Sequence, residues 1–392
     1  MGSSLRLFRI WGIDVKVHWS FLLILVYGAF LYSGQTNRLT GALYGVVVIL
    51  LLFVCVLLHE FGHALTAKYF KVNVPHITLL PIGGVAQLER MPRQPLQEFL
   101  IAIAGPAVNF VLALLLLPLA VLVIGLTWGA DSLLSLLTYA QTRMMTPSLD
   151  GLLVYLAVTN IALGLFNLLP AFPMDGGRVL RSLLAMAMPY VRATRIAVTV
   201  GRLMAVLMAL WGLGGNIMLL LIAFFIYVGG RGELEAVESR YVLKDIRAKD
   251  ALNREARTIY TSESIDKVVD LVMTTYQADF PVFDLGNNFV GVLTRPRLVA
   301  VLRTQGREGR IVDVMIPAQD VPPVGPETTL ADVWDKMMEA GSRVVAVKEQ
   351  GRFLGLITLD DISELIQVVG ATKERDERVA AQPTANPTDF SN

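Results

Sequence analysis

Residues 46–63 read Val-Val-Val-Ile-Leu-Leu-Leu-Phe-Val-Cys-Val-Leu-Leu-His-Glu-Phe-Gly-His, a long apolar run that ends in three ionisable side chains. A membrane-spanning helix needs about 20 mostly apolar residues, and the run over residues 42–68 supplies them. Ionisable side chains inside such a run are costly and usually functional. His59, Glu60 and His63 are therefore the first candidates for chemistry, whereas Cys55 is interpreted as a small core hydrophobe.

The composition places this helix in a membrane protein. Hydrophobic residues make up 54% of the 392 residues and charged residues only 17%, whereas a soluble globular chain is about 25% charged. Residues 231–392, in contrast, have the composition of an ordinary soluble protein. The net charge of +1 gives no reason to expect a nucleic-acid partner.

Hydropathy predicts a polytopic α-helical membrane protein with about six transmembrane helices, followed by an α+β soluble part. The membrane domain is expected over residues 1–235, with spans near 18–34, 42–68, 99–126, 150–171, 196–213 and 215–230. Residues 77–88, apolar and turn-rich, favour a re-entrant or membrane-surface hairpin.

The distribution of Lys and Arg predicts the orientation in the bilayer. Cytoplasmic flanks of membrane helices carry an excess of these residues. With the N-terminus inside, twelve of them fall on inner flanks: Arg6, Arg9, Lys16, Lys68, Lys71, Arg90, Arg93, Arg178, Arg181, Arg192, Arg195 and Arg231. The outer loops hold only Arg38 and Arg143. We therefore expect a multi-pass protein of the cell membrane whose N-terminus and soluble part are both cytoplasmic.

The motif His59-Glu60-Phe61-Gly62-His63 has the spacing of a zinc site. On a helix, residues at i and i+4 lie on one face, so both imidazoles can bind one Zn²⁺. Glu60, beside the first ligand, can reach a zinc-bound water and act as general base. The alternative is a His/Glu cluster that hydrogen-bonds between helices.

A catalytic zinc normally has three protein ligands and one open position. Histidine is a poor candidate for the third ligand, because neither of the two other histidines lies inside a predicted span. The acids that compete for the role are Glu98, Asp131, Asp150 and Asp175. Asp175 follows Pro170 and Pro173 at the end of an apolar run, where broken backbone is expected to line a cavity at membrane depth.

Residues 10–230 closely resemble the site-2 protease family of intramembrane metalloproteases. His59-Glu60-Phe-Gly-His63 is similar to the zinc motif of that family, and Asn167-Leu-Leu-Pro-Ala-Phe-Pro-Met-Asp175-Gly-Gly resembles its second signature. The resemblance implies His59, His63 and Asp175 as zinc ligands and Glu60 as general base. It also implies that Asn167 faces the scissile carbonyl, whose developing oxyanion an amide N–H can stabilise.

Two further segments resemble family motifs. Residues 83–89, beginning with Gly83-Gly84, are similar to a glycine-containing segment near the active site, and an extended edge there could bind an unwound substrate by strand addition. A plain surface hairpin is the alternative. Gly105-Pro-Ala-Val-Asn109 is interpreted as close helix packing without a chemical step, and Asn160 as packing between helices.

The soluble part contains an internal repeat with a spacing of 64–65 residues. Gly291-Val-Leu-Thr294 of the first copy matches Gly355-Leu-Ile-Thr358 of the second. Residues 244–369 resemble a tandem pair of cystathionine-β-synthase-type (CBS) domains. We predict CBS domain 1 over residues 244–306, CBS domain 2 over 307–370, and a disordered tail over 371–392.

The resemblance to CBS domains implies a possible adenosine nucleotide, such as AMP or ATP, bound by Thr358 and Asp361 of the second copy. In the first copy Arg297 stands where the aspartate is expected, so at most one ordinary nucleotide site is predicted. Thr358 and Asp361 also match a plain helix start, an N-cap with an acidic residue three positions later. Homodimerisation through the CBS domains is the alternative role.

These patterns together predict a zinc-dependent intramembrane endopeptidase with one Zn²⁺ per chain. Its substrate would be a transmembrane protein or peptide in the lipid bilayer, and the CBS pair would serve as a regulatory module. A CBS-regulated transporter and a non-catalytic membrane scaffold are the alternatives. A transporter should show matched broken helices, whereas the sequence has a single break, near Asp175.

Overall fold

The computed structural model describes residues 4–34, 37–81, 83–87, 94–128, 138–139, 146–252, 256–275, 277–304, 306–307 and 309–369. The chain divides into two compact units, Met1–Leu234 and Glu235–Asn392. The boundary between them lies at the end of the predicted membrane domain. The tail predicted over residues 371–392 lies outside the described residues.

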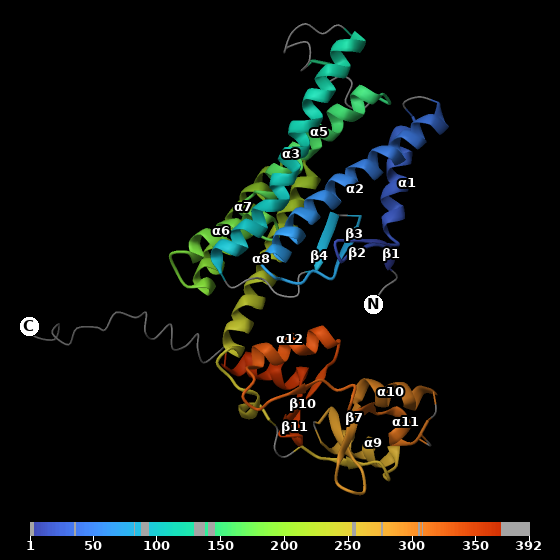
Figure 1. Ribbon diagram of the computed structural model, residues 1–392, viewed down its shortest axis with the longest axis vertical. Helices are drawn as coiled ribbons and strands as arrows, with labels where there is room; N and C mark the ends of the chain where they lie inside the picture. Colours follow the sequence, from blue (N-terminus) through green and yellow to red (C-terminus); the bar gives the residue numbers. More distant parts are fainter. Residues whose placement is uncertain are drawn as a thin grey trace, which may run out of the picture. The chain divides into compact units, whose positions relative to one another are not determined.

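The first unit is built mainly from apolar helices (Figure 1). They are α1 (Phe21–Tyr32), α2 (Arg38–Tyr69), α3 (Pro95–Trp128), α5 (Leu149–Asn167), α6 (Asp175–Ala185), α7 (Tyr190–Gly212) and α8 (Ile217–Leu243). Among the described residues, five helices are long and apolar enough to cross a membrane: α2, α3, α5, α7 and α8. The predicted fold class, a polytopic helical membrane protein, is confirmed.

The first predicted span is shorter than the sequence indicated. The apolar run over residues 18–34 yields α1, which has 12 residues and is therefore about 18 Å long at 1.5 Å per residue. That length is below the roughly 30 Å of a hydrocarbon core. His18 belongs to a strand, and α1 begins only at Phe21 and ends at Tyr32. By contrast, α2 has 32 residues, about 48 Å, and exceeds the core thickness.

A four-stranded sheet packs against α2. Its strands are β1 (Ser4–Ile10), β2 (Ile13–His18), β3 (His76–Leu80) and β4 (Gly83–Gln87), in the order β1-β2-β3-β4. β1 pairs antiparallel with β2, β2 parallel with β3, and β3 antiparallel with β4. The hairpin predicted near residues 77–88 is thus β3–β4, whereas β1 and β2 were not predicted.

The contact between sheet and helix is apolar and fully buried. Side chains of β2 and β3 meet those of α2 in one cluster, which includes Ile13, Val15, Phe61, Ala64, Ala67 and Ile77. Because β4 is the last strand in the sheet and contacts α2, the sheet places one of its edges next to the helix that carries the His-Glu motif.

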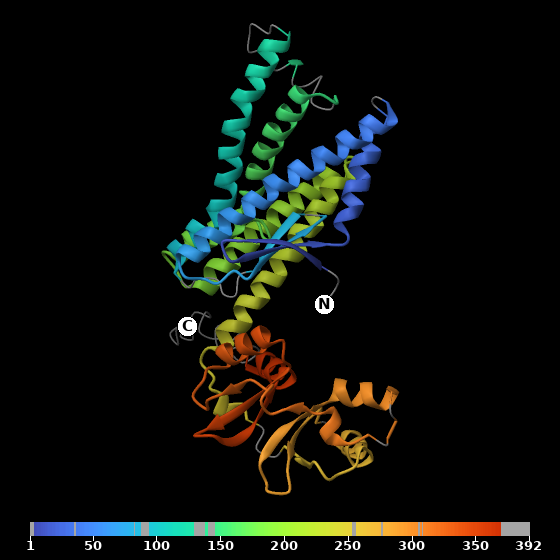
Figure 2. The same ribbon diagram turned by 45° about the vertical axis from the view of Figure 1, so that its right-hand side comes forward.

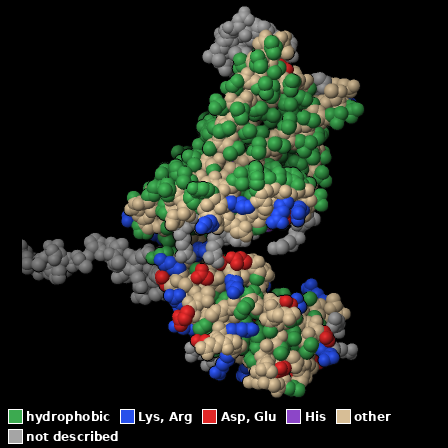
Figure 3. Space-filling view, in the orientation of Figure 1, with side chains coloured by type: hydrophobic (Ala, Val, Ile, Leu, Met, Phe, Trp, Pro, Cys, Tyr) green, Lys and Arg blue, Asp and Glu red, His purple; other side chains and the backbone are tan. Residues whose placement is uncertain are grey.

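The other long helices complete the unit. α3 and α5 lie side by side in both views (Figure 1, Figure 2). Figure 3 shows hydrophobic side chains over a broad surface of these helices, with Lys and Arg gathered at one end of the unit. An apolar belt of this kind is expected of helices that face lipid.

The second unit contains two copies of one α+β motif. The first copy comprises β5 (Ile259–Tyr260), α9 (Ile265–Thr274), β6 (Asp279–Phe283), β7 (Phe289–Thr294), α10 (Arg295–Thr304), α11 (Ile311–Val314) and β8 (Ile316–Pro317). The second comprises β9 (Pro323–Val324), α12 (Leu330–Ala340), β10 (Val344–Glu349), β11 (Arg352–Thr358) and a helix over residues 359–369. A short 3₁₀ helix, η1 (Ala248–Asp250), precedes them.

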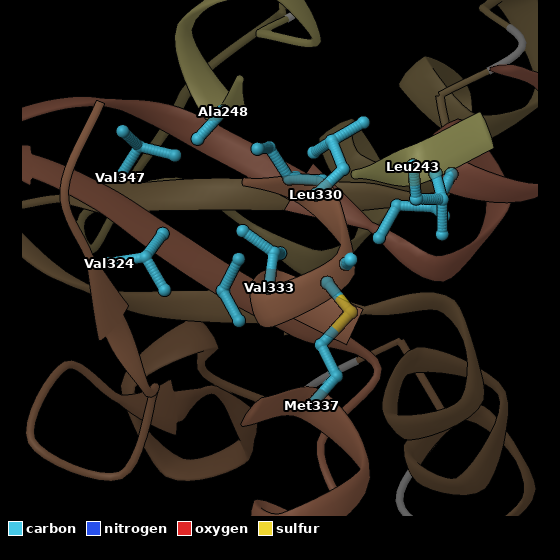
Figure 4. Close-up of a cluster of buried hydrophobic side chains, with 11 residues drawn as sticks. Leu243, Ala248, Val324, Leu330, Val333, Met337 and Val347 are labelled. Carbon is cyan, nitrogen blue, oxygen red and sulfur yellow. The ribbon is translucent and has the colours of Figure 1, made fainter. Parts of the chain in front are cut away.

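The two copies share a topology. In each, a short strand pairs parallel with the strand that follows the first helix, and that strand pairs antiparallel with the next. Figure 4 shows the core of the second copy, in which Val333 and Met337 of α12 meet Val324 and Val347 of the sheet. Leu243, the last residue of α8, is buried in the same core (Figure 4).

Candidate functional site

His59 and His63 lie one turn apart on α2, and both are buried. Their Nε2 atoms face each other at 3.1 Å. Oδ2 of Asp175, from the first residue of α6, lies 3.3 Å from His59 Nε2 and 3.1 Å from His63 Nε2. Among the described residues, these three form the one group of His, Cys, Asp or Glu with the geometry of a metal site.

The separations fit a tetrahedral zinc ion. Zn²⁺ binds imidazole nitrogen and carboxylate oxygen at about 2.0–2.2 Å, so tetrahedral ligand atoms lie about 3.3–3.6 Å apart. The observed 3.1–3.3 Å is within a few tenths of an ångström of that range. The arrangement offers three candidate ligands, the number typical of a catalytic zinc with one open position.

The hydrogen bond of each Nδ1 atom fixes the tautomer of the imidazole and leaves Nε2 as the nitrogen that can bind a metal. His63 Nδ1 lies 2.7 Å from the carbonyl oxygen of Ile101, and His59 Nδ1 lies 2.7 Å from Oδ1 of Asn109. A carbonyl oxygen only accepts, so each Nδ1 donates. Each neutral imidazole then directs an Nε2 lone pair toward Asp175, an arrangement that a bound cation stabilises.

Asn109 was not predicted as part of the site. The sequence interpretation assigned Gly105-Pro-Ala-Val-Asn109 to helix packing alone, and α3 does pack closely on α2 there. The signal that could have identified Asn109 was its polarity within an apolar helix, since a buried amide needs a partner. The carbonyl of Ile101 carries no signal at all, because every residue has one.

Gly105 makes room for the two imidazoles. A Cβ atom at this position would lie 2.2 Å from His63 Nε2 and 2.7 Å from His59 Nε2. Real Cβ atoms do not approach other atoms so closely, and both contacts would involve the two converging Nε2 atoms. The absence of a side chain on α3 at residue 105 therefore leaves the space in which the ligand atoms converge.

The loop that precedes α6 places Asp175 in this space. α5 ends at Asn167, and residues 168–174 turn back so that α6 begins at Asp175. The turn is tight, since a Cβ atom on Gly176 would lie 2.3 Å from the carbonyl of Leu168.

The other acids that competed for the role of third ligand lie elsewhere. Glu98 pairs with Arg181, and Asp150 lies in the first turn of α5. Asp131 lies outside the described residues.

Glu60 is half-buried beside the two histidines, and the edge of β4 holds it. The backbone N–H of Ala86 donates to Glu60 Oε2 at 3.2 Å. A Cβ atom on Gly84 would lie 2.5 Å from Glu60 Cγ and 3.0 Å from its Oε1. Gly84 thus lets the strand approach the carboxylate closely, and Gly83 precedes it with a φ of +139°, which favours glycine.

The two asparagines of α5 differ in their surroundings. Asn167, the last residue of the helix, is half-buried eight residues before Asp175, and its contact with substrate stays a prediction. Asn160 is fully buried and donates from Nδ2 to the carbonyl of Leu156 at 2.8 Å.

Thr358 and Asp361, the candidate nucleotide residues, bond to each other. Asp361 Oδ2 accepts from the backbone N–H of Thr358 at 2.8 Å and from its hydroxyl at 2.7 Å. Thr358 Oγ1 accepts from the N–H of Asp361 at 3.1 Å. These bonds make the helix start that the sequence offered as the alternative. In the first copy, Arg297 donates to the carbonyl of Met315 at 3.2 Å.

A buried carboxylate, Asp279, lies close enough to Asp360 and Asp361 at this helix start for their charges to act on it. Asp279 begins β6, is 8% exposed, and accepts from the N–H of Arg295 at 3.1 Å. Burial raises the pKa of the Asp279 carboxyl above its ordinary value, and the negative charges of Asp360 and Asp361 act in the same direction.

Both units contain segments that match known protein families. The sequence profile of peptidase family M50 matches residues 47–210, and that of the CBS domain matches residues 311–368. A zinc metalloprotease of Methanocaldococcus jannaschii is 32% identical over 377 residues, which cover 95% of this chain and 99% of the relative. Rip3 of Mycobacterium tuberculosis is 30% identical over 387 residues, 94% of each chain.

Among solved structures, the site-2 protease from Methanocaldococcus jannaschii is 38% identical, with a TM-score of 0.42. The match covers 59% of this chain and 95% of that chain. The profile match over residues 47–210 includes His59, His63 and Asp175.

Proposed function

Because this chain belongs to peptidase family M50, the site-2 proteases, we propose that it is a zinc-dependent endopeptidase that cuts within the membrane. Its substrates would be peptide bonds in or near the transmembrane segments of other proteins. The observation that carries the proposal is the convergence of His59, His63 and Asp175 beside Glu60, on helices apolar enough to span a bilayer.

In this proposal, His59, His63 and Asp175 hold one Zn²⁺. Bound zinc supplies a Lewis acid that polarises the scissile carbonyl and brings the pKa of a water in its open position to about 7. Asn109 and the Ile101 carbonyl keep the two imidazoles in the orientation and tautomer that binding requires.

Glu60 is proposed as the general base. Its carboxylate accepts the proton of the attacking water and then delivers it to the leaving amine. The N–H of Ala86 holds one carboxylate oxygen in place, so β4 orients the base. Asn167 is proposed to donate an amide N–H to the carbonyl oxygen, where negative charge develops during the attack.

The same strand is proposed to bind the substrate. β4 is the last strand of the sheet, and its free edge lies next to Glu60. A transmembrane segment that unwinds can add to such an edge as a further strand, which satisfies its backbone hydrogen bonds at membrane depth. The backbone of Gly83 and Gly84 is proposed to face the substrate strand; a Cβ atom on Gly83 would meet nothing within 4 Å, whereas the space beside Gly84 is filled by Glu60.

The orientation in the membrane is proposed from the Lys/Arg asymmetry. The N-terminus and the CBS pair would be cytoplasmic. A reporter fused after Gly370 should therefore score as cytoplasmic, and one inserted at Asp131 as exterior. The opposite result for both reporters would reverse the proposed topology.

The CBS pair is proposed to regulate the protease without taking part in its chemistry. It could do so by binding AMP or ATP or by mediating a homodimer. A nucleotide shifts an equilibrium only if it binds one arrangement better than another. Calorimetry with AMP and ATP on the full chain tests the first route, and Asp361→Ala should reduce any heat of binding. No heat with either nucleotide would leave dimerisation as the role.

The proposed activity is tested by reconstituting the full chain in lipid vesicles with a transmembrane peptide substrate. Cleavage should require zinc, and Glu60→Gln should reduce the rate at least about 100-fold, the lower end of general-base contributions. Glu349→Gln, an exposed residue in the second unit, is the matched control. Protein that binds no zinc would favour a transporter or scaffold instead.

A further inference from the structure

Arg181 is a fully buried arginine that bridges two carboxylates. It lies on α6 and is 1% exposed. Its Nε and Nη2 donate to Glu98 Oε1 at 2.8 and 2.5 Å, and its Nη1 donates to Glu233 Oε1 at 2.6 Å. Glu98 belongs to the first turn of α3, and Glu233 belongs to α8. One guanidinium thus connects three helices.

Two aromatic rings enclose the same guanidinium. Its Cζ lies 4.9 Å from the centroid of Phe172 and 5.0 Å from that of Tyr190. Burying a charge is costly unless hydrogen bonds and opposite charges compensate it. A planar guanidinium can stack on rings while it bonds to two carboxylates, which a lysine ammonium cannot do. The surroundings therefore hold Arg181 in one position.

Two of the residues that contact Arg181, Glu98 and Phe172, lead to the zinc site by a short path. Three residues after Glu98 on α3 comes Ile101, whose carbonyl orients His63. Phe172 lies in the loop that ends at Asp175, and Arg181 itself is on the helix that Asp175 begins. Arg181 touches none of the proposed ligands, yet it ties together the segments that place two of them.

The third partner, Glu233, leads in the other direction along α8. Seven residues later on this helix, Arg240 donates to Asp335 of the second CBS copy at 2.6 Å. The helix ends at Leu243, which is 2% exposed within the core of that copy. At 1.5 Å per residue, Glu233 and Arg240 are about 10 Å apart along the axis. α8 therefore carries both the carboxylate that pairs with Arg181 and the arginine that pairs with Asp335.

We propose that Arg181 is a positioning residue of the zinc site, and that Glu233 on α8 connects it to the CBS pair. The inference rests on the proposed function, which it deepens with a route for regulation. Movement of α8 would change the Glu233–Arg181 contact, and Arg181 would transmit that change to α6 and the loop that carries Asp175. The ligand geometry would then depend on the state of the CBS pair.

The positioning role is tested on the full chain by measuring zinc release to a chelator. Arg181→Gln should weaken zinc retention about 10–100-fold, the range seen when groups that support metal ligands are removed. Arg181→Lys keeps the charge and should give an intermediate value. Arg202→Gln, which removes a partly buried arginine stacked on Tyr227 of α8, is the control and should retain zinc like the parent.

Retention by Arg181→Gln within twofold of the Arg202→Gln control would overturn the positioning role. If Arg181→Gln does not fold, Arg181→Lys and Glu233→Gln decide the question by the same measurement, because both keep a cation paired with Glu98. Zinc release needs no substrate, so it reports on Arg181 even if the chain proves not to be a protease. Lack of cleavage by the zinc-loaded parent would instead refute the proposed function.

The connection to the CBS pair is tested with a double-mutant cycle on the cleavage rate. Glu233→Gln removes the ion pair of α8 with Arg181, and Asp335→Asn removes the ion pair of Arg240 with the second CBS copy. Changes more than about 7–10 Å apart normally act additively, so coupling of about fivefold or more between these two, well above the ordinary scatter of additivity, indicates transmission along α8. Glu233→Gln combined with Glu327→Gln, which breaks the exposed Lys249 pair, is the control cycle and should be additive. Additivity in both cycles would overturn the connection.

Discussion

The candidate zinc site and the candidate nucleotide site differ in where their polar atoms point. In the first unit, two Nε2 atoms and a carboxylate oxygen lie 3.1–3.3 Å apart. Each histidine donates its Nδ1 proton to a carbonyl oxygen, so all three of the converging atoms are acceptors. In the second unit, Thr358 and Asp361 satisfy each other. Convergent acceptors need a cation, whereas a closed capping box needs no ligand.

The largest expected effect comes from filling the space between the ligands. Gly105→Ala places a Cβ atom where His63 Nε2 lies at 2.2 Å, so the protein should lose most of its zinc. Gly125→Ala, on the same helix, meets nothing within 4 Å and is the matched control, because both changes raise helix propensity equally. The readout is zinc per chain by mass spectrometry. Equal zinc in the two variants would mean that the site is less confined than the contacts indicate.

The second prediction concerns the group that orients His59. Asn109→Ala removes the acceptor for His59 Nδ1 and should weaken zinc affinity about 10–100-fold. Asn160→Ala is the control, since this buried amide bonds to its own helix. Affinity is measured by competition with a chelator. If both variants bind zinc like the parent, Asn109 has a packing role alone.

The third prediction separates the base from the metal. Gly84→Ala brings a Cβ atom within 2.5 Å of Glu60 Cγ, so Glu60 must move while the ligands stay in place. The turnover number should fall about tenfold or more, less than the loss on removing the base, and zinc content should not change. Val85→Ala, at an exposed position on the same strand, should behave like the parent. Unchanged turnover in Gly84→Ala would argue against this position of Glu60.

The smallest expected effect is a pH dependence in the second unit. Because burial raises the pKa of Asp279 in the folded state, folding binds a proton between the unfolded pKa of about 3.9 and the folded value. Stability therefore falls as pH rises through this window, and the buried charge costs most at neutral pH. Asp279→Asn removes the charge and keeps an acceptor for Arg295.

The gain in stability of Asp279→Asn over the parent should grow from pH 4 to pH 7. It is measured as protection of strands β6 and β7 against hydrogen exchange in the full chain. Asp320→Asn, at an exposed position, controls for the loss of one negative charge. A difference that is the same at both pH values would show that the carboxylate does not titrate in this window.

Much of the fold could be predicted because its signals are local. Long apolar runs predicted the helices α2, α3, α5, α7 and α8, and the internal repeat predicted the two copies of the motif in the second unit. The strands β1 and β2 were missed, since residues 4–18 were interpreted as a basic flank. β2 pairs in parallel with β3, some 60 residues away, and local patterns do not reveal such a pairing.

In the candidate site, too, the local features could be predicted and the long-range contacts could not. His59, Glu60 and His63 are adjacent in sequence, so helical spacing alone places them together. Asn109 and the Ile101 carbonyl reach the histidines only because α3 crosses α2 at Gly105. Such contacts depend on the tertiary arrangement. Arg181 was predicted as one of many basic residues on an inner flank, and its two carboxylate partners come from distant helices.

The most direct test is the zinc content of four purified proteins: the parent, Glu60→Gln, His63→Ala and Asp175→Ala. If the three converging atoms hold the metal and Glu60 only moves protons, the parent and Glu60→Gln should carry about one zinc per chain. His63→Ala and Asp175→Ala, each with one ligand fewer, should carry much less. A full zinc complement in both ligand variants would contradict the proposed site.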